Sequence, residues 1–134
     1  MEDTIINQLE VAPHSVVLQA ASDFAKTLAE TSQYKAFESA TELLRADTQA
    51  QETANAYQLK HQSLRGVIML NAVNKEDRDE LEQLKDSYLK RSSVIQYNQA
   101  QSNLIVLCQE VGDILSQSIG FDFPAAGKKG GGCC

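Results

Sequence analysis

The chain has 134 residues, of which 43% are hydrophobic and 22% are charged, and its formal net charge is −6. These values are typical of one folded domain and argue against a disordered chain. The negative net charge argues against direct contact with nucleic acid or an anionic membrane, because a protein that binds either one needs a positive surface. An acidic N-terminus, with no apolar stretch long enough to span a membrane, predicts a cytoplasmic protein.

The two prolines, Pro13 and Pro124, enclose a stretch with little glycine, which favours helices throughout. The sequence therefore predicts an all-α fold. We expect an elongated helical bundle of about five helices, with a long C-terminal helix and a flexible Gly/Cys tail. The expected parts are an N-terminal extension over residues 1–13, a helical bundle domain over 14–120 and the flexible tail over 121–134.

The first predicted helix begins just after Pro13. Its apolar stripe has the three- and four-residue spacing of a helix face: Val17, Ala21, Phe24, Ala25 and Leu28. Thr31 and Ser32 indicate the end of this helix and the N-cap of a short second one. The second helix has one apolar face: Tyr34, Phe37, Ala40 and Leu44.

Asp47 and Thr48 indicate the next N-cap, and Thr48 and Gln51 have capping-box spacing. The third helix is predicted to be longer, and residues 71–74 are the weakest part of the helical pattern. Its face is Ala50, Ala54, Tyr57, His61, Leu64 and Ile68. Asn74 precedes two acidic residues and predicts the start of a fourth helix, because negative charge is favourable there. The apolar positions of this helix are Leu81, Leu84, Tyr88 and Leu89.

The fifth helix is the longest, and we expect it to begin at Ser92 and Ser93, where Ser93 and Gln96 again have capping-box spacing. Its stripe is Tyr97, Gln101, Leu104, Cys108, Val111, Leu115 and Ser118. About 25 residues give a length of roughly 37 Å, which is longer than a compact small domain. We therefore expect another subunit to cover part of the stripe, the alternative being that the other helices cover all of it. The predicted interface residues are Tyr57, Leu64, Tyr97, Gln101 and Leu104.

Motifs of catalysis are not found in the sequence. It has no phosphate loop, no His-Glu-x-x-His pattern and no serine elbow, so we expect a protein that is not an enzyme. Cys108 is predicted to be a small core residue, and His61 to be partly buried on a helix face. Gln101 is expected to make a buried or interfacial hydrogen bond. A carboxylate metal site inside the bundle stays open, because its ligands would come from several helices.

The chain ends in three glycines followed by Cys133 and Cys134. Thiols on such a tether are candidates for a metal or iron–sulfur cluster, a lipid, or redox exchange. Two thiolates are half of a four-thiolate set, so a cluster would need ligands from other chains. A tail that binds nothing is one alternative. Double prenylation, as at the Cys-Cys end of Rab GTPases, is another, although the rest of a Rab is missing.

From the second helix onward the sequence resembles the bacterial YlbF/YmcA family, over most of residues 15–120. The matching positions lie on helix faces: Tyr34, Lys35, Ala36, Phe37, Ala40, Leu44, Ala46, Asp47, Ala50, Gln51, Tyr57, Gln58, Gln62, Val94, Tyr97, Ala100, Gln101 and Leu104. A Gly-rich tail with cysteines is similar to the end of YlbF-like members, whereas the YheA-like branch generally lacks it.

The resemblance implies a helical bundle that forms homo-oligomers, or hetero-oligomers with YlbF/YmcA-like and YaaT-like proteins. YlbF and YmcA act with YaaT in a complex that carries iron–sulfur clusters. That complex influences RNA maturation by ribonuclease Y, and with it competence, sporulation and biofilm formation. For this chain the resemblance implies a regulatory adaptor in which Cys133 and Cys134 contribute ligands to a shared iron–sulfur cluster. The alternative is a structural self-association module of the YheA type with an inert tail.

Overall fold

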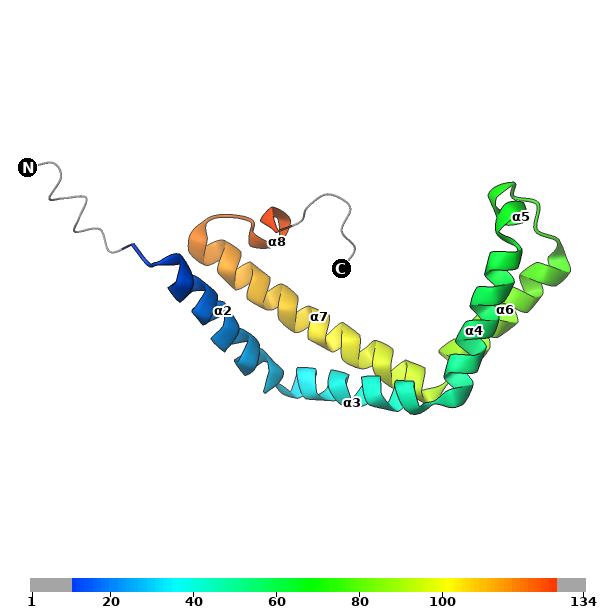
Figure 1. Cartoon of the computed structure of the whole chain (residues 1–134), viewed down its shortest axis with the longest axis horizontal. Helices are drawn as coiled ribbons and strands as arrows, with labels where there is room; N and C mark the ends of the chain where they lie inside the picture. The colour runs from blue at the N-terminus through cyan, green and yellow to red at the C-terminus, as the bar shows by residue number, and fades with distance from the viewer. Residues whose placement is uncertain (1–10, 128–134) are drawn as a thin grey trace, which may run out of the picture.

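The computed structural model describes residues 11–127, and these contain helices and no strand (Figure 1). The helices are α2 His14–Ala29, α3 Ser32–Ala46, α4 Thr48–Ser63, α5 Arg65–Met69, α6 Lys75–Leu89, α7 Ser92–Ile119 and α8 Phe123–Ala126. The prediction of an all-α fold with a long C-terminal helix is confirmed, since α7 has 28 residues.

The molecule is built from two helix pairs. Helix α3 packs along α7, and α4 packs along α6, so that Figure 1 shows two arms extending from a common bend. The Phe37 and Tyr97 rings join the first arm, with centroids 5.5 Å apart. Lys60 joins the second arm through ion pairs to Asp77 at 2.7 Å and Glu80 at 2.8 Å. We call the bend, where Asp47 and Arg91 meet, the elbow.

The predicted helix starts are correct where the capping side chain and its partner amide are neighbours in the sequence. Thr31 accepts a hydrogen bond from the Tyr34 amide at 3.2 Å, and Asn74 accepts one from the Asp77 amide at 2.8 Å. These two predicted N-caps are confirmed, because in each the side-chain oxygen satisfies an amide that the first helical turn leaves free.

Both predicted capping boxes are wrong. Of the two residues predicted at the start of α4, Asp47 is confirmed as the N-cap, because its carboxylate accepts from the Ala50 amide. Gln51 does not complete a capping box with Thr48, and donates its side-chain amide to the Leu44 carbonyl instead. Helix α7 has Arg91 as its N-cap residue with no side-chain cap. The Ser93 hydroxyl, which was expected to cap this helix, donates to Asp47 Oδ2 at 2.6 Å. The Ser93 hydroxyl therefore bonds to Asp47, which is distant in the sequence, and not to a backbone amide in the first turn of α7.

The predicted third helix is divided in two. Helix α4 ends at Ser63, Leu64 has φ −98° and ψ 2°, and α5 is a separate short helix. A turn with Asn71 at φ 53° then leads to α6. Asparagine is among the residues that tolerate this left-handed conformation.

The core of the described residues is small, and it lies in the α3–α7 arm and at the elbow. Its buried apolar residues are Ala40, Ala50, Val94 and Ala100. Val94 is the large side chain among them, with 1% of its surface exposed. Helix α2 contains no buried residue. The chain therefore covers its apolar surface well near the start of α7 and poorly along α2.

The start of the tail was predicted at residue 121, but residues 123–126 form helix α8. Gly120 ends α7 in the left-handed conformation at φ 65°, which favours glycine. The chain then returns along α7, where the Phe123 amide donates to Ser116 Oγ at 3.1 Å. Asp122 caps α8 by accepting from the Ala125 amide at 3.4 Å. Cys133 and Cys134 lie outside the described residues.

Candidate protein-interaction surface

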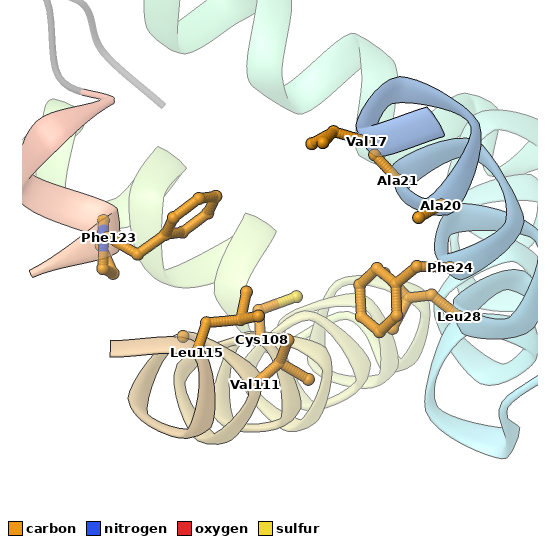
Figure 2. Close-up of a pocket in the computed structure, with 11 residues that line it drawn as sticks. Val17, Ala20, Ala21, Phe24, Leu28, Cys108, Val111, Leu115 and Phe123 are labelled. Atoms are coloured by element: carbon orange, nitrogen blue, oxygen red, sulfur yellow. The ribbon is translucent and has the colours of Figure 1, made fainter. Parts of the chain in front are cut away.

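An apolar groove of about 610 Å³ lies between α2, the C-terminal half of α7 and α8 (Figure 2). We call it the apolar slot. It is lined by Val17, Ala20, Ala21, Phe24, Leu28, Cys108, Val111, Gly112, Leu115, Phe123 and Pro124. None of these side chains carries a charge, so the slot can exclude water from an apolar partner but offers no acid, base or cation for chemistry.

Helix α2 forms one wall of the slot because its apolar residues recur with the helical period. Val17, Phe24 and Leu28 lie on one face, and Figure 2 shows Phe24 and Leu28 extending from α2 toward α7. Phe24 keeps 46% of its surface exposed and Val17 keeps 55%. The main contacts of α2 within the chain are with α3, which directly follows it. The apolar stripe of α2 is therefore largely uncovered.

Helices α7 and α8 form the opposite wall. Gly112 is buried, and a Cβ atom at this position would lie 3.2 Å from Pro124 Cγ, so glycine allows α8 to approach closely. Cys108 also lines this wall and is exposed. The prediction that Cys108 is a core residue is wrong, because Cys108 lines the open slot, where the helices of residues 11–127 leave it exposed.

The five predicted interface residues do not form one surface. Tyr57 lies on α4 and lines a smaller groove with Leu84 and Tyr88 of α6. Its ring stacks on His61 with centroids 6.0 Å apart, and His61 is exposed, so the prediction that it is partly buried is wrong. Leu64 is half-buried between α4 and α5.

The other three predicted residues lie on α7. The Tyr97 ring packs against Phe37, so part of its surface is used inside the α3–α7 arm. Leu104 is half-buried and Gln101 is exposed, so Gln101 does not make the predicted buried hydrogen bond among residues 11–127. Sequence reasoning missed the contributions of Phe24 and Phe123 to an interaction surface. The spacing of the α2 stripe was a visible signal for Phe24, whereas nothing in the sequence indicated that Phe123 begins a helix.

The elbow contains the most connected polar cluster. Arg91 donates to Asp47 through Nε at 2.8 Å and Nη2 at 2.7 Å, and its Nη1 donates to Gln49 Oε1 at 2.9 Å. The hydrogen bonds from Arg91, followed by that from Ser93, hold the pKa of the Asp47 carboxyl well below its usual range. The same bond to Asp47 raises the pKa of Arg91. A carboxylate with these partners stays ionised and fixes geometry, and it is a poor proton acceptor.

A second charged cluster joins α4 to α6. Hydrogen bonds to Asp77 and then to Glu80 raise the pKa of the Lys60 ammonium group. Lys60 is therefore a fixed cation between two carboxylates, and its surroundings are those of a structural cross-link.

Metal ligation was predicted for Cys133 and Cys134, which lie beyond residue 127. Within residues 11–127, no group of three or more His, Cys, Asp or Glu side chains is placed to hold a metal ion. Over the same range, no helix combines the length and apolarity needed to cross a bilayer.

The described residues form an all-α protein with an open groove whose lining is uncharged. Residues 17–120 match a family model described as control of competence regulator ComK, YlbF/YmcA. Because the match covers most of the chain, the protein belongs to the YlbF/YmcA family, and the resemblance found in the sequence is confirmed. No curated protein and no solved structure matches the chain. Helix α8, which forms part of the slot, follows the matched residues.

Proposed function

We propose that this chain is a cytoplasmic, non-enzymatic regulatory adaptor of the YlbF/YmcA type. It acts in a multi-protein complex with YlbF/YmcA-like and YaaT-like proteins that modulates RNA processing by ribonuclease Y. Competence, sporulation and biofilm formation are the processes that this regulation reaches. Membership of a family that controls a competence regulator supports a regulatory role.

The observation that carries the proposal is the apolar slot. Eleven uncharged residues from three helices line an open groove of about 610 Å³. Exposed apolar patches of this kind mark contacts with other proteins, whereas a catalytic pocket adds a few convergent polar groups to its apolar lining. The net charge of −6 is unfavourable for direct RNA contact, so the effect on RNA is exerted through a ribonuclease partner.

The test is genetic and uses the slot directly. A strain that lacks this protein should accumulate unprocessed ribonuclease Y substrates, and the wild-type gene should restore processing. Phe24→Glu should restore it poorly, because a carboxylate in the slot is costly to bury against a partner. Leu59→Glu is the matched control, since Leu59 lies on α4 with 67% of its surface exposed. Normal RNA processing in the strain without the protein would contradict the proposal.

An iron–sulfur cluster is the second part of the proposal. Cys133 and Cys134 would supply two thiolate ligands and partner subunits the others, because four thiolates hold a typical cluster. Anaerobic reconstitution with iron and sulfide, with the partner subunits present, should give visible absorption that Cys133→Ser/Cys134→Ser abolishes. Cys108→Ser is the matched control and should retain it. Equal iron content in all three proteins would show that Cys133 and Cys134 are not ligands of the cluster.

A structural self-association module of the YheA type is the second candidate, and the uncovered stripe of α2 favours it. In that case the tail is inert. Deletion of residues 128–134, which leaves α8 in place, should then change neither the oligomeric state nor the cellular phenotype. A loss of RNA processing with an unchanged oligomeric state would favour the adaptor over the module.

A further inference from the structure

We propose that Cys108 forms a disulfide bond with Cys133 or Cys134 of the same chain under oxidising conditions, and that this bond holds the C-terminal segment over the apolar slot. The slot is then open in the reduced protein and covered in the oxidised one. The inference goes beyond the adaptor role, because it assigns a covalent partner to Cys108 and a control to the slot. Four observations carry it: the place of Cys108, the path of the chain through α8, the spacing of the cysteines and the charge on α7.

Cys108 is placed where a thiol can react. It lines the α7 wall of the slot and is exposed, and Figure 2 shows its sulfur atom pointing from α7 toward the space between α7 and α2. Access decides which cysteines exchange, since buried structural cysteines are inert. The slot lining is uncharged, and a disulfide is uncharged as well, so the bond places no unpaired charge against apolar side chains.

Helix α8 brings the C-terminal segment of the chain close to Cys108. Pro124 packs on Gly112, where a Cβ atom would lie 3.2 Å from Pro124 Cγ, and both residues line the slot together with Cys108. Cys108 precedes Gly112 by one helical turn, which is a rise of about 6 Å. Cys133 is the sixth residue after Gly127, and six extended residues span up to about 20 Å. Both tail thiols therefore reach Cys108 while α7 and α8 keep their positions.

Cys108 is a better disulfide partner for either tail cysteine than the tail cysteines are for each other. Adjacent residues have Cα atoms about 3.8 Å apart across a trans peptide bond, whereas disulfide-bonded residues usually have Cα atoms roughly 4.4–6.8 Å apart. A bond between Cys133 and Cys134 is therefore strained and easily reduced. The chain has three cysteines, so Cys108 is the remaining partner, and a short tether gives it an effective concentration in the millimolar range.

The charge on α7 favours the approach of the tail. Helix α7 carries two acidic residues, Glu110 and Asp113, and no basic one, and both acids are exposed. The segment after Gly127 carries Lys128 and Lys129 and no acidic residue. Opposite charges raise the local concentration of one group near the other, so the tail lysines favour positions near the end of α7.

The oxidant is a small-molecule disulfide such as oxidised glutathione. A tail thiolate attacks one sulfur of oxidised glutathione, the S–S bond breaks, and one glutathione thiolate leaves. The Cys108 thiolate then attacks the tail sulfur of this mixed disulfide and displaces the second glutathione. The two protein thiols lose two protons and two electrons, and oxidised glutathione takes up both to give two reduced molecules. A tail thiolate that holds a cluster is not available for this attack, so the bond forms in the cluster-free chain.

Peptide mapping of the full, cluster-free chain tests the bond. Reduced protein at low micromolar concentration is treated with oxidised glutathione, its remaining thiols are alkylated, and the tryptic peptides are identified by mass spectrometry. The peptide that contains Cys108 should be joined to the peptide that contains Cys133 and Cys134, in a protein that keeps its monomer mass of 14.7 kDa on non-reducing electrophoresis. Glutathione adducts without this link, or linked pairs of chains in its place, would overturn the inference.

A matched variant tests whether the slot selects Cys108. In the Cys108→Ser background, Val106→Cys adds a thiol two residues away on α7, at a position that is 50% exposed and lines a different groove, beside α3. This thiol should join the tail about tenfold more slowly than Cys108 does, because it lies outside the slot and access limits the exchange. Equal rates at the two positions would overturn the inference, since the tail would then pair with any exposed thiol on α7.

Binding of the apolar dye anilinonaphthalene sulfonate tests whether the bond covers the slot. Dye fluorescence should fall when the bond forms and recover after reduction with dithiothreitol, while Cys108→Ser treated in the same way should show no change. Equal dye binding by the linked and reduced proteins would overturn the covering of the slot. The bond is measured on the isolated chain, so normal RNA processing in a strain without the protein would remove the adaptor role and leave this inference standing.

Discussion

The elbow and the apolar slot lie near opposite ends of α7. They differ in how far contacts within the chain bury their side chains and pair their polar groups. At the elbow, the Asp47 carboxylate receives hydrogen bonds from the Arg91 and Ser93 side chains and the Ala50 amide, and Val94 is 1% exposed. At the slot, Phe24 and Phe123 keep about half of their surface exposed, at 46% and 52%. The contacts of the first region are completed within the chain, whereas the apolar side chains of the second are only half covered by the described residues.

The difference shows how one long helix serves two purposes. The start of α7 is held by contacts within the chain, because Arg91 and Ser93 both bond to Asp47 at the junction of the two arms. The end of α7 keeps apolar surface exposed, and a partner that covered this surface would gain the favourable free energy of burying it. Changes at the elbow should therefore affect folding, and changes at the slot should affect assembly.

The largest effect on folding is expected from Val94→Ala. Removal of two buried methyl groups loses their transfer free energy and leaves a cavity, which together cost roughly 1.5–3 kcal/mol of unfolding free energy. Ile95→Ala is the matched control, because the neighbouring Ile95 is 51% exposed and should change stability little. Chemical denaturation measures both. Equal losses in the two variants would remove the distinction between a packed elbow and an open surface.

The next effect concerns the Asp47–Arg91 pair. Asp47→Asn and Arg91→Gln should each lower the denaturation midpoint, and the double variant should lower it by much less than the two effects added together, because each single change already breaks the same bonds. Glu42→Gln, at an exposed position of α3, is the control for loss of a carboxylate. Simple additivity would show that Asp47 and Arg91 act independently.

Acid should weaken the elbow in a defined range of pH. The Asp47 carboxyl has a pKa below its usual value of about 3.9, so the unfolded chain binds this proton more readily than the folded one. The stabilisation from Asp47 is present above about pH 4 and declines as the pH falls toward the lower pKa of the folded state. Asp47→Asn should show a smaller loss of stability than wild type between about pH 5 and pH 2. Parallel curves would contradict the assignment.

The smallest effect is expected at Gly112. Alanine is normally better than glycine inside a helix by roughly 0.5–1 kcal/mol, and Gly66→Ala, which would meet no atom within 4 Å, should show this gain. At Gly112 the new methyl group would lie 3.2 Å from Pro124 Cγ, so the gain should be reduced and α8 should move away from α7. Hydrogen exchange at residues 123–126 follows this movement. Unchanged protection there would show that α8 does not depend on Gly112.

The sequence predicted those parts of the fold that depend on local chemistry. The caps at Thr31 and Asn74 were found because their partner amides are three residues away. The elbow was not found, because Asp47 and Arg91 are 44 residues apart and nothing in their spacing shows that they meet. The capping box expected at Ser93 was wrong for the same reason, since its hydroxyl bonds to Asp47.

The candidate site shows a second limit of sequence reasoning. The stripe through Cys108 correctly identified the apolar face of α7, but periodicity does not reveal whether another helix of the same chain covers that face. Exposed Cys108 was therefore predicted to be buried. Helix α8 was missed because a short segment with Pro124, alanines and Gly127 has the composition of a linker.

Hydrogen exchange of α2 at several protein concentrations tests the central claim most directly. If the slot is an interface through which the chain self-associates, as the second candidate function proposes, protection of the α2 amides should rise with protein concentration, while protection of the α7 amides near Val94 should stay constant. Strong protection of α2 that does not change with concentration, in a chain that sediments as a monomer, would show that α2 is stable without a partner. That result would contradict the account of the slot as an unfinished interface.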